Sequence, residues 1–191
     1  MKILLISDIH GNAEALRAVM RAETDADAAI FLGDALLSGP QANETLELLD
    51  ELKPNIAIRG NHDDDVLDPS GFRGWPAEWI ALNDWILADL DASAVAKIER
   101  FTDAGWYEFG GISAYLHHGD LGHRDLAAVP DADEEVFNLL AGGTDAELVL
   151  FGHTHVQFTH KIGCRTFINP GSVGQPRCGA LHACYLSLIH I

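Results

Sequence analysis

Histidine, aspartate and asparagine recur at five places in the chain, each directly after a short apolar segment. The five sequences are "SDIHG", "LGD", "GNHD", "HHGD" and "GHTH". They contain seven side chains that could bind a metal ion through oxygen or nitrogen: Asp8, His10, Asp34, Asn61, His118, His153 and His155. Carboxylate, imidazole and amide donors without a thiolate suit Mn, Fe, Ni or Zn better than Ca or a structural zinc site.

The number of candidate ligands indicates more than one metal ion. Seven ligands are too many for a single ion that keeps an open coordination position. They suit two ions that share a bridging carboxylate, and two such ions about 3.5–4 Å apart can promote displacement at phosphorus. Asp8 and His10 are two residues apart, as are His153 and His155. On extended strands each pair would point to one side.

Each of these sequences alone also has an ordinary structural explanation. Gly-Asp after a strand is common in turns, and "GNHD" contains the Asn and Asp that turns favour. Five such sequences in one order, each at an apolar strand end, favour chemistry over five unrelated turns. The other histidines are expected to be structural: His117 would face away from the side of His118, and His160 would lie at the surface of the next strand. The acidic runs at 63–65 and 131–135 are expected to be solvated loop and helix start.

The elements that position these residues can be inferred from apolar patterning. In the first third of the chain, apolar strands such as "KILLIS", "AAIFLGD" and "NIAIRGN" alternate with helical segments, which predicts a parallel sheet covered on both faces. Ligands bind beyond the carboxyl ends of the strands in such sheets. Residues 76–101 have a helical pattern with Trp79, Leu82, Trp85 and Ile86 on one face. A hairpin around Gly110 and Gly111, followed by further strands, predicts a second, partly antiparallel sheet.

Composition limits the class of protein. The chain has 191 residues, of which 48% are hydrophobic, and is expected to form one domain over 1–191. The net charge of −17 argues against general nucleic-acid or anionic-membrane binding. An odd number of cysteines and no signal peptide predict reduced thiols and a cytoplasmic protein. The final "LHACYLSLIHI" is expected to be a truncated or non-native end, and homo-oligomer formation stays open.

The blocks "DIHGN", "LGD", "RGNHD", "HHG" and "FGHTH", in this order, resemble the calcineurin-like metallophosphoesterases. The likeness is to their small bacterial and archaeal phosphodiesterase-type branch, and it extends from Met1 to about Arg177, including "INPGSVGQPR". The resemblance implies an α/β fold, a four-layer αββα sandwich. It also implies hydrolysis of a small phosphate monoester or diester, with nucleotides among the candidates, by attack of a hydroxide that bridges two metal ions.

The resemblance further implies a role for each motif residue. One metal would be held by Asp8, His10, Asp34 and His155, and the other by Asp34, Asn61, His118 and His153, with Asp34 bridging. His62 would be the catalytic acid, and Asn61, His62 and Arg59 would contact the substrate. Manganese is the expected metal, with Fe, Ni and Zn as alternatives. The loops at 63–76 and 119–131 would select the substrate, and "NPGSVGQPR" would buttress the site, with a substrate role for Ser172 or Arg177 as the lesser alternative.

Two other functions remain as alternatives. The same fold serves as a non-catalytic metal-binding scaffold in the retromer coat, where the catalytic histidine is lost, but this chain keeps His62. A DNA-repair nuclease is the second alternative. The small size of the chain and its charge of −17 weigh against it.

Overall fold

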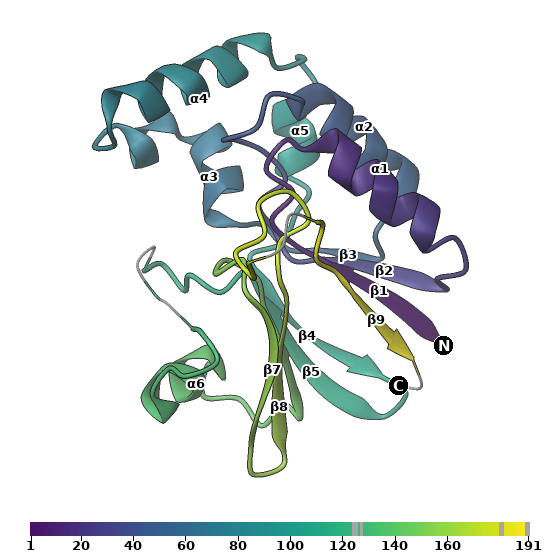
Figure 1. Cartoon of the computed structure of the whole chain (residues 1–191). Helices are drawn as coiled ribbons and strands as arrows, with labels where there is room; N and C mark the ends of the chain where they lie inside the picture. The colour runs from purple at the N-terminus through teal and green to yellow at the C-terminus, as the bar shows by residue number, and fades with distance from the viewer. Residues whose placement is uncertain (124–125, 127, 180–181, 190–191) are drawn as a thin grey trace.

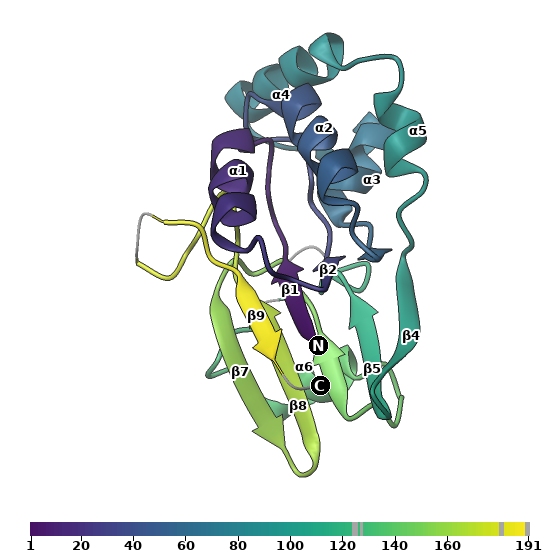
Figure 2. The ribbon, with the colours of Figure 1, turned by 90° about the vertical axis from the view of Figure 1, so that its right-hand side faces the viewer.

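The chain folds into two β-sheets that pack face to face, with helices on the outer face of each (Figures 1 and 2). The computed structural model describes residues 1–123, 126, 128–179 and 182–189. One sheet has the strand order β3-β2-β1-β9 and the other has β4-β5-β6-β8-β7. The predicted αββα sandwich is therefore confirmed. Within the described residues, no helix combines the length and apolar character needed to cross a membrane.

The first sheet carries the N-terminal part of the chain. Its parallel strands are β1 (Lys2–Ile6), β2 (Ala28–Phe31) and the short β3 (Ile56–Ala57), and β9 (Leu186–Ile189) pairs antiparallel with β1. Helices α1 (Ala13–Ala22), α2 (Ala42–Leu52) and α5 (Ala94–Ile98) cover its outer face. The expected cap of α1 is present, because the side chain of Asn12 accepts a hydrogen bond from the Ala15 amide at 3.1 Å.

The second sheet contains the predicted hairpin. Strands β4 (Ala104–Phe109) and β5 (Ile112–His117) are joined by Gly110 and Gly111, whose φ angles of 61° and 89° suit a tight turn. The sheet continues with β6 (Leu148–Leu150) and β8 (Arg165–Pro170), each parallel to its neighbour, and ends with β7 (Gln157–Ile162), antiparallel to β8. Helix α6 (Glu134–Leu140) covers its outer face.

An apolar layer between the two sheets holds them together. The first sheet and the segment after it contribute Ile3, Leu5, Ile30, Leu32 and Ile58, and the second contributes Ala114, Leu116, Leu150 and Ile168. All of these side chains are buried. Because burying apolar surface is the main favourable term in folding, this layer fixes how the loops of one sheet meet those of the other.

The segment 61–101 differs from the single helical pattern expected over 76–101. It contains α3 (Asn61–Leu67), a 3₁₀ turn (Pro69–Phe72), α4 (Ala77–Asp89) and α5, with an extended break at Leu90. Trp79 and Trp85 are 45% and 54% exposed, whereas Ile86 is 1% exposed, so the predicted common face of α4 is wrong. The helix instead turns the buried Asn83 inward, where its side chain accepts a hydrogen bond from the Ser38 amide at 3.3 Å.

Candidate metal centre

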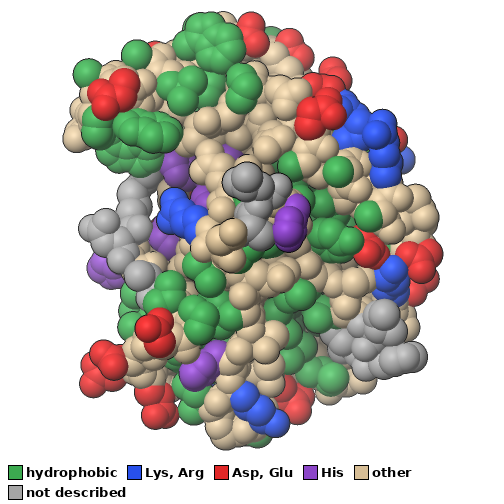
Figure 3. Space-filling model, viewed as in Figure 1, with side chains coloured by type: hydrophobic (Ala, Val, Ile, Leu, Met, Phe, Trp, Pro, Cys, Tyr) green, Lys and Arg blue, Asp and Glu red, His purple; other side chains and the backbone are tan. Residues whose placement is uncertain are grey.

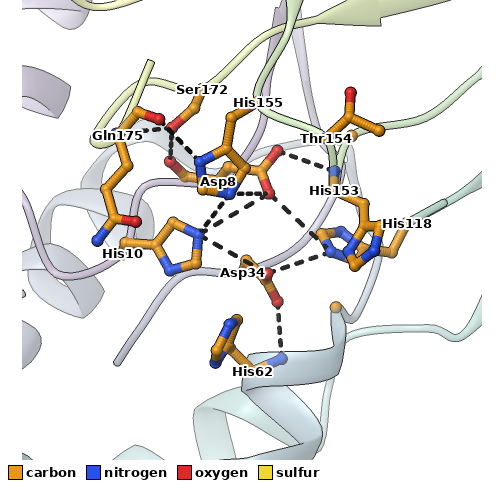
Figure 4. A network of polar contacts seen from close by, with 12 residues as sticks. Asp8, His10, Asp34, His62, His118, His153, Thr154, His155, Ser172 and Gln175 are labelled. Atoms are coloured by element: carbon orange, nitrogen blue, oxygen red, sulfur yellow. Dashed lines mark hydrogen bonds and ion pairs between the residues drawn. The ribbon is translucent and has the colours of Figure 1, made fainter. Parts of the chain in front are cut away.

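The polar motif residues come together where loops from the two sheets meet (Figure 4). Asp8 and His10 follow β1, Asp34 follows β2, and Asn61 begins α3. His118 follows β5, and His153 and His155 follow β6. A backbone bond joins the two loops of the second sheet, since Gly152 N–H donates to His118 O at 2.6 Å.

Five of these side chains bring their ligand atoms close together. His118 Nε2 lies 3.2 Å from Asp34 Oδ2, and His155 Nε2 lies 3.3 Å from Asp8 Oδ1. His10 Nε2 lies 3.0 Å from His155 Nε2 and 3.8 Å from Asp34 Oδ2. Among the described residues, three overlapping groups offer one ligand atom per residue within 4.8 Å of one another: Asp8, His10 and His155; Asp8, Asp34 and His118; and His10, Asp34 and His62.

An unusual backbone conformation produces this convergence. Asp8, His10, Asp34, His153 and His155 have φ angles of 55°, 49°, 61°, 68° and 61°. The expectation that the ligand pairs lie on extended strands is wrong, because β1 ends at Ile6 and β7 begins only at Gln157. Left-handed backbone is uncommon for residues other than glycine, and such strain concentrates at functional sites.

The glycines of the motifs allow the loops to approach closely. A Cβ atom on Gly33, whose φ is 101°, would lie 2.7 Å from Gly60 N and 2.6 Å from His118 Nδ1. A Cβ atom on Gly152 would lie 1.9 Å from Ser7 Oγ. These contacts are too short for any side chain, so the glycines before Asp34 and His153 are required by packing at the site.

Backbone carbonyls orient two of the imidazoles. His118 Nδ1 donates to Leu32 O at 2.7 Å, and His155 Nδ1 donates to Gln175 O at 2.8 Å. A carbonyl can only accept, so a neutral ring held in this way presents its Nε2 lone pair to the centre. His153 is fixed differently, because its backbone N–H donates to Asp8 Oδ2 at 3.1 Å.

The electrostatics of the cluster suit a bound cation. Burial disfavours charge on Asp34, but the neighbouring His118, His62 and His10 together outweigh burial and hold the pKa of Asp34 well below its ordinary value. Burial also opposes charge on His118, yet Asp34 and Asp8 raise the pKa of His118 to about 10. Burial lowers the pKa of His10 to about 4, so this ring is neutral near pH 7. Within the described residues, the buried atoms Asp8 Oδ1 and His118 Nε2 have ion-pair contacts with His155 and Asp34 but no other hydrogen-bond partner. Two buried carboxylates among imidazoles therefore fit divalent transition-metal ions.

His62 lies beside the cluster at the start of α3. Its backbone N–H donates to Asp34 Oδ1 at 2.8 Å, and its ring centroid is 5.1 Å from that of His10. His62 Nδ1 is 3.5 Å from Asp65 Oδ2. The histidine is therefore held from its backbone by the central carboxylate and faces a second carboxylate through its ring.

The acidic run 63–65 is largely buried, contrary to the expected solvated loop. Asp63 accepts hydrogen bonds from the amides of Asp34 at 2.9 Å, Ala35 at 2.9 Å and Gly60 at 3.0 Å. Burial and the neighbouring Asp34 raise the pKa of Asp63 to about 7. Asp65 is also buried, so only Asp64 reaches solvent. The first turn of α3 packs against the loop after β2, which explains the difference.

Three other residues singled out in the sequence lie apart from the centre. Arg59 forms ion pairs with Asp64 and Asp103 and is not part of the cavity wall described below. His117 donates from Nε2 to Leu140 O at 3.0 Å on the opposite side of β5, as expected. His160 is half-buried rather than at the surface, because it stacks on Phe137 of α6 with ring centroids 4.0 Å apart.

The end of β8 and the segment after it hold the loops of the site by hydrogen bonds, as the sequence suggested. Ser172 Oγ donates to Asp8 O at 2.6 Å and accepts from Gln175 N–H at 2.7 Å. The buried Asn169 donates to Gly152 O at 2.7 Å. Ser172 thus holds the loop after β1 (Figure 4), and Asn169 holds the loop after β6.

An open cavity of about 910 Å³ lies over the cluster. On the face in Figure 3, histidine and basic side chains border a hollow below a hydrophobic patch at upper left. His10, Asp34 and His155 of the cluster and the neighbouring Asn61, His62 and His153 line this cavity. Its walls also include Trp75, Pro76, Trp79, Leu126, Val129, Val156, Gln175 and Arg177. The two loops expected to select substrate both reach this wall. Sequence reasoning missed Trp79, whose exposure depends on the packing of α4.

The two-sheet fold and the cluster of histidine and aspartate side chains are those expected of the calcineurin-like phosphoesterases. The calcineurin-like phosphoesterase superfamily domain matches residues 1–189, so the chain belongs to that superfamily. It is 27% identical to phosphodiesterase YfcE of Escherichia coli K12 over 191 residues, which cover 94% of this chain and 83% of that protein.

Solved structures agree with this assignment. A metallophosphoesterase from Sphaerobacter thermophilus superposes with a TM-score of 0.77 and 29% identity, covering 98% of this chain and 83% of that one. Wild-type Vps29 from Entamoeba histolytica, solved in complex with Zn²⁺, superposes with a TM-score of 0.55 and 17% identity, covering 100% of this chain and 86% of that one. At that identity the second likeness concerns the fold alone.

Proposed function

We propose that the chain is a two-metal phosphoesterase that hydrolyses a phosphate monoester or diester. The observation that carries the proposal is the convergence of buried carboxylate and imidazole ligand atoms on the floor of an open cavity. Asp8, His10, Asp34 and His155 would hold one ion, and Asp34, Asn61, His118 and His153 would hold the other. The nitrogen and oxygen donor set suits manganese, with Fe, Ni and Zn as alternatives.

Different residues of the chain would have different roles in such a reaction. Divalent ions bound here would supply Lewis-acid stabilisation of the phosphoryl oxygens and hydroxide near neutral pH. His62 lines the cavity and is held by Asp34, so it is suitably placed to protonate the leaving oxygen. Asn61 lines the cavity beside it and would contact the phosphate. The ion pairs of Arg59 make its proposed contact with the substrate the weakest of the set.

The non-catalytic scaffold is the competing function. The relative named phosphodiesterase YfcE favours hydrolysis, and so do the retained His62 and the open cavity. The likeness to Vps29 is too distant to carry an argument about activity.

The experiment is a metal-controlled hydrolysis assay. Protein stripped with a chelator is reloaded with Mn, Fe, Ni or Zn, its metal content is measured, and 4-nitrophenyl phosphate and bis(4-nitrophenyl) phosphate are offered. Hydrolysis that disappears with the metal and returns with it is the expected result. Full metal content without hydrolysis of either ester would support the scaffold instead.

A further inference from the structure

One wall of the cavity is aromatic and stands directly beside His62. Trp75 and Pro76 lie in the turn before α4, and Trp79 lies in its first turn; all three line the cavity. The Trp75 ring is 5.4 Å from the His62 ring, and the buried Phe72 lies behind Trp75 at 6.2 Å. Trp79 is 45% exposed and is part of the cavity lining, so a ligand in the cavity can reach its indole ring.

The remaining lining of the cavity is partly aliphatic and partly polar. Leu126, Val129 and Val156 also line the cavity, and Gln175 and Arg177 add polar groups. A volume of about 910 Å³ exceeds what a phosphate group alone would fill and lies within the range of pockets for drug-sized ligands. Branched aliphatic and indole side chains suit a flat, rigid group better than a polar sugar.

A basic residue completes the lining. Arg177 is exposed at the cavity and, within the described residues, forms no ion pair, although the chain has 29 acidic residues to 12 Lys and Arg. An unpaired cation in so acidic a chain favours an anionic ligand at this place.

We infer that the cavity takes a nucleotide-class phosphoester, whose base stacks on Trp75 and Trp79 while its phosphate lies over the metal cluster. This inference rests on the proposed function. In the proposed reaction His62 protonates the leaving alcohol, and Trp75 lies beside His62. A base that stacks on Trp75 therefore belongs to the nucleoside that leaves. Stacking of a base on an aromatic side chain strengthens binding by about 10- to 100-fold.

The test compares two non-hydrolysable ligands that differ only in the base. The phosphonate analogues of adenosine 5′-phosphate and ribose 5-phosphate, in which a methylene group replaces the ester oxygen, are titrated calorimetrically into metal-loaded protein. The adenosine analogue is expected to bind at least about 10-fold more tightly. Trp79→Ala should remove most of this ratio, and Trp79→Phe should restore much of it.

Trp85 provides a matched control on the same helix. It is 54% exposed and lies outside the cavity lining, so Trp85→Ala should leave the ratio unchanged. Equal binding of the two analogues to the wild type, or an equal loss in both alanine variants, would overturn the inference. Metal-dependent hydrolysis of 4-nitrophenyl esters would then still stand as evidence for the proposed function. If the adenosine analogue binds more tightly but the protein hydrolyses no ester, the proposed enzymatic function is refuted and the inferred base-binding site still stands.

Discussion

Asp34 is the residue on which the proposed centre depends most. Its Oδ1 accepts from the His62 amide at 2.8 Å, and its Oδ2 lies 3.2 Å from His118 Nε2 and 3.8 Å from His10 Nε2. One carboxylate thus contacts residues of both proposed ligand sets and the proposed acid. A bridging ligand would need this central position.

The first prediction concerns this bridge. Asp34→Asn removes the charge of the side chain but keeps its shape, so the content of both metals should fall. Hydrolysis should drop by at least about 100-fold, which exceeds the usual effect of replacing a residue that only hydrogen-bonds to a metal ligand. Elemental analysis and steady-state kinetics measure the two effects. Asp64→Asn, at an exposed carboxylate of α3, should change neither. Wild-type metal content in Asp34→Asn would count against the bridging role.

The second prediction separates proton transfer from metal binding. A poor alkoxide leaving group needs a proton, whereas a nitrophenolate hardly does. His62→Asn should keep both metals and most activity on a nitrophenyl ester, but lose about 10²–10⁴-fold on an alkyl ester, roughly 3–5 kcal/mol of barrier. The measurement is kcat/KM for both esters in both proteins. The same loss on both esters would rule out the general-acid role.

The sequence predicted which residues gather here but not how their backbones bring them together. Residue types and their order after apolar strands were enough to predict that Asp8, Asp34, His118 and His155 lie close together. A two-residue spacing suggested strand geometry, yet Asp8 and its partner His10 adopt left-handed turns. Asp and His tolerate that conformation without requiring it, so no local pattern reveals it.

At the scale of elements, the third prediction concerns the loop after β8. Ser172→Ala removes a buried donor to Asp8 O and leaves Gln175 N–H without its acceptor. We expect a loss of about 1–3 kcal/mol in unfolding free energy and a 10–100-fold weaker metal affinity, because Gln175 O orients His155. Denaturant unfolding and metal titration measure these. Ser113→Ala, whose hydroxyl accepts from Glu147 N–H at 3.1 Å, should leave metal affinity unchanged. Reduced stability with normal metal affinity would mean that the loop supports the fold only.

The fourth prediction tests the backbone of the turn between β6 and β7. His153 has a φ of 68°, which disfavours any residue with a Cβ atom. Metal-free His153→Gly should therefore be more stable than His153→Ala by about 1–2 kcal/mol. At the exposed Glu47 in the middle of α2 the order should reverse, with alanine better by about 0.5–1 kcal/mol. Chemical denaturation of the four variants measures both differences. Equal stability of the two His153 variants would show that the turn is relaxed in solution.

Elements with a strong local signal were predictable, and those set by tertiary packing were not. The cap of α1 by Asn12 and the Gly110–Gly111 turn follow from residue type alone. The break at Leu90 and the inward turn of Asn83 do not, because a continuous apolar pattern over 76–101 cannot show that α4 packs against the loop containing Ser38.

At the scale of the whole molecule, the proposed centre joins the two sheets. Asp8 and Asp34 come from loops of the first sheet, and His118, His153 and His155 come from loops of the second. The chain also carries a net charge of −17, and two of its carboxylates are buried here among histidines. Bound cations would offset this charge and hold the sheets together, so metal binding and global stability should be coupled.

The last prediction measures that coupling. A ligand that binds only the folded state stabilises it by about 2.7 kcal/mol when its free concentration is 100 times Kd. For a chain of 191 residues, each kcal/mol raises Tm by about 2–4 °C, so chelation should lower Tm by about 5–11 °C. Asp34→Asn should abolish most of this difference, whereas Asp64→Asn should retain it. Differential scanning calorimetry with and without chelator provides the measurement. An identical Tm for metal-loaded and chelated wild type, with metal content verified, would mean that the ions do not hold the two sheets together.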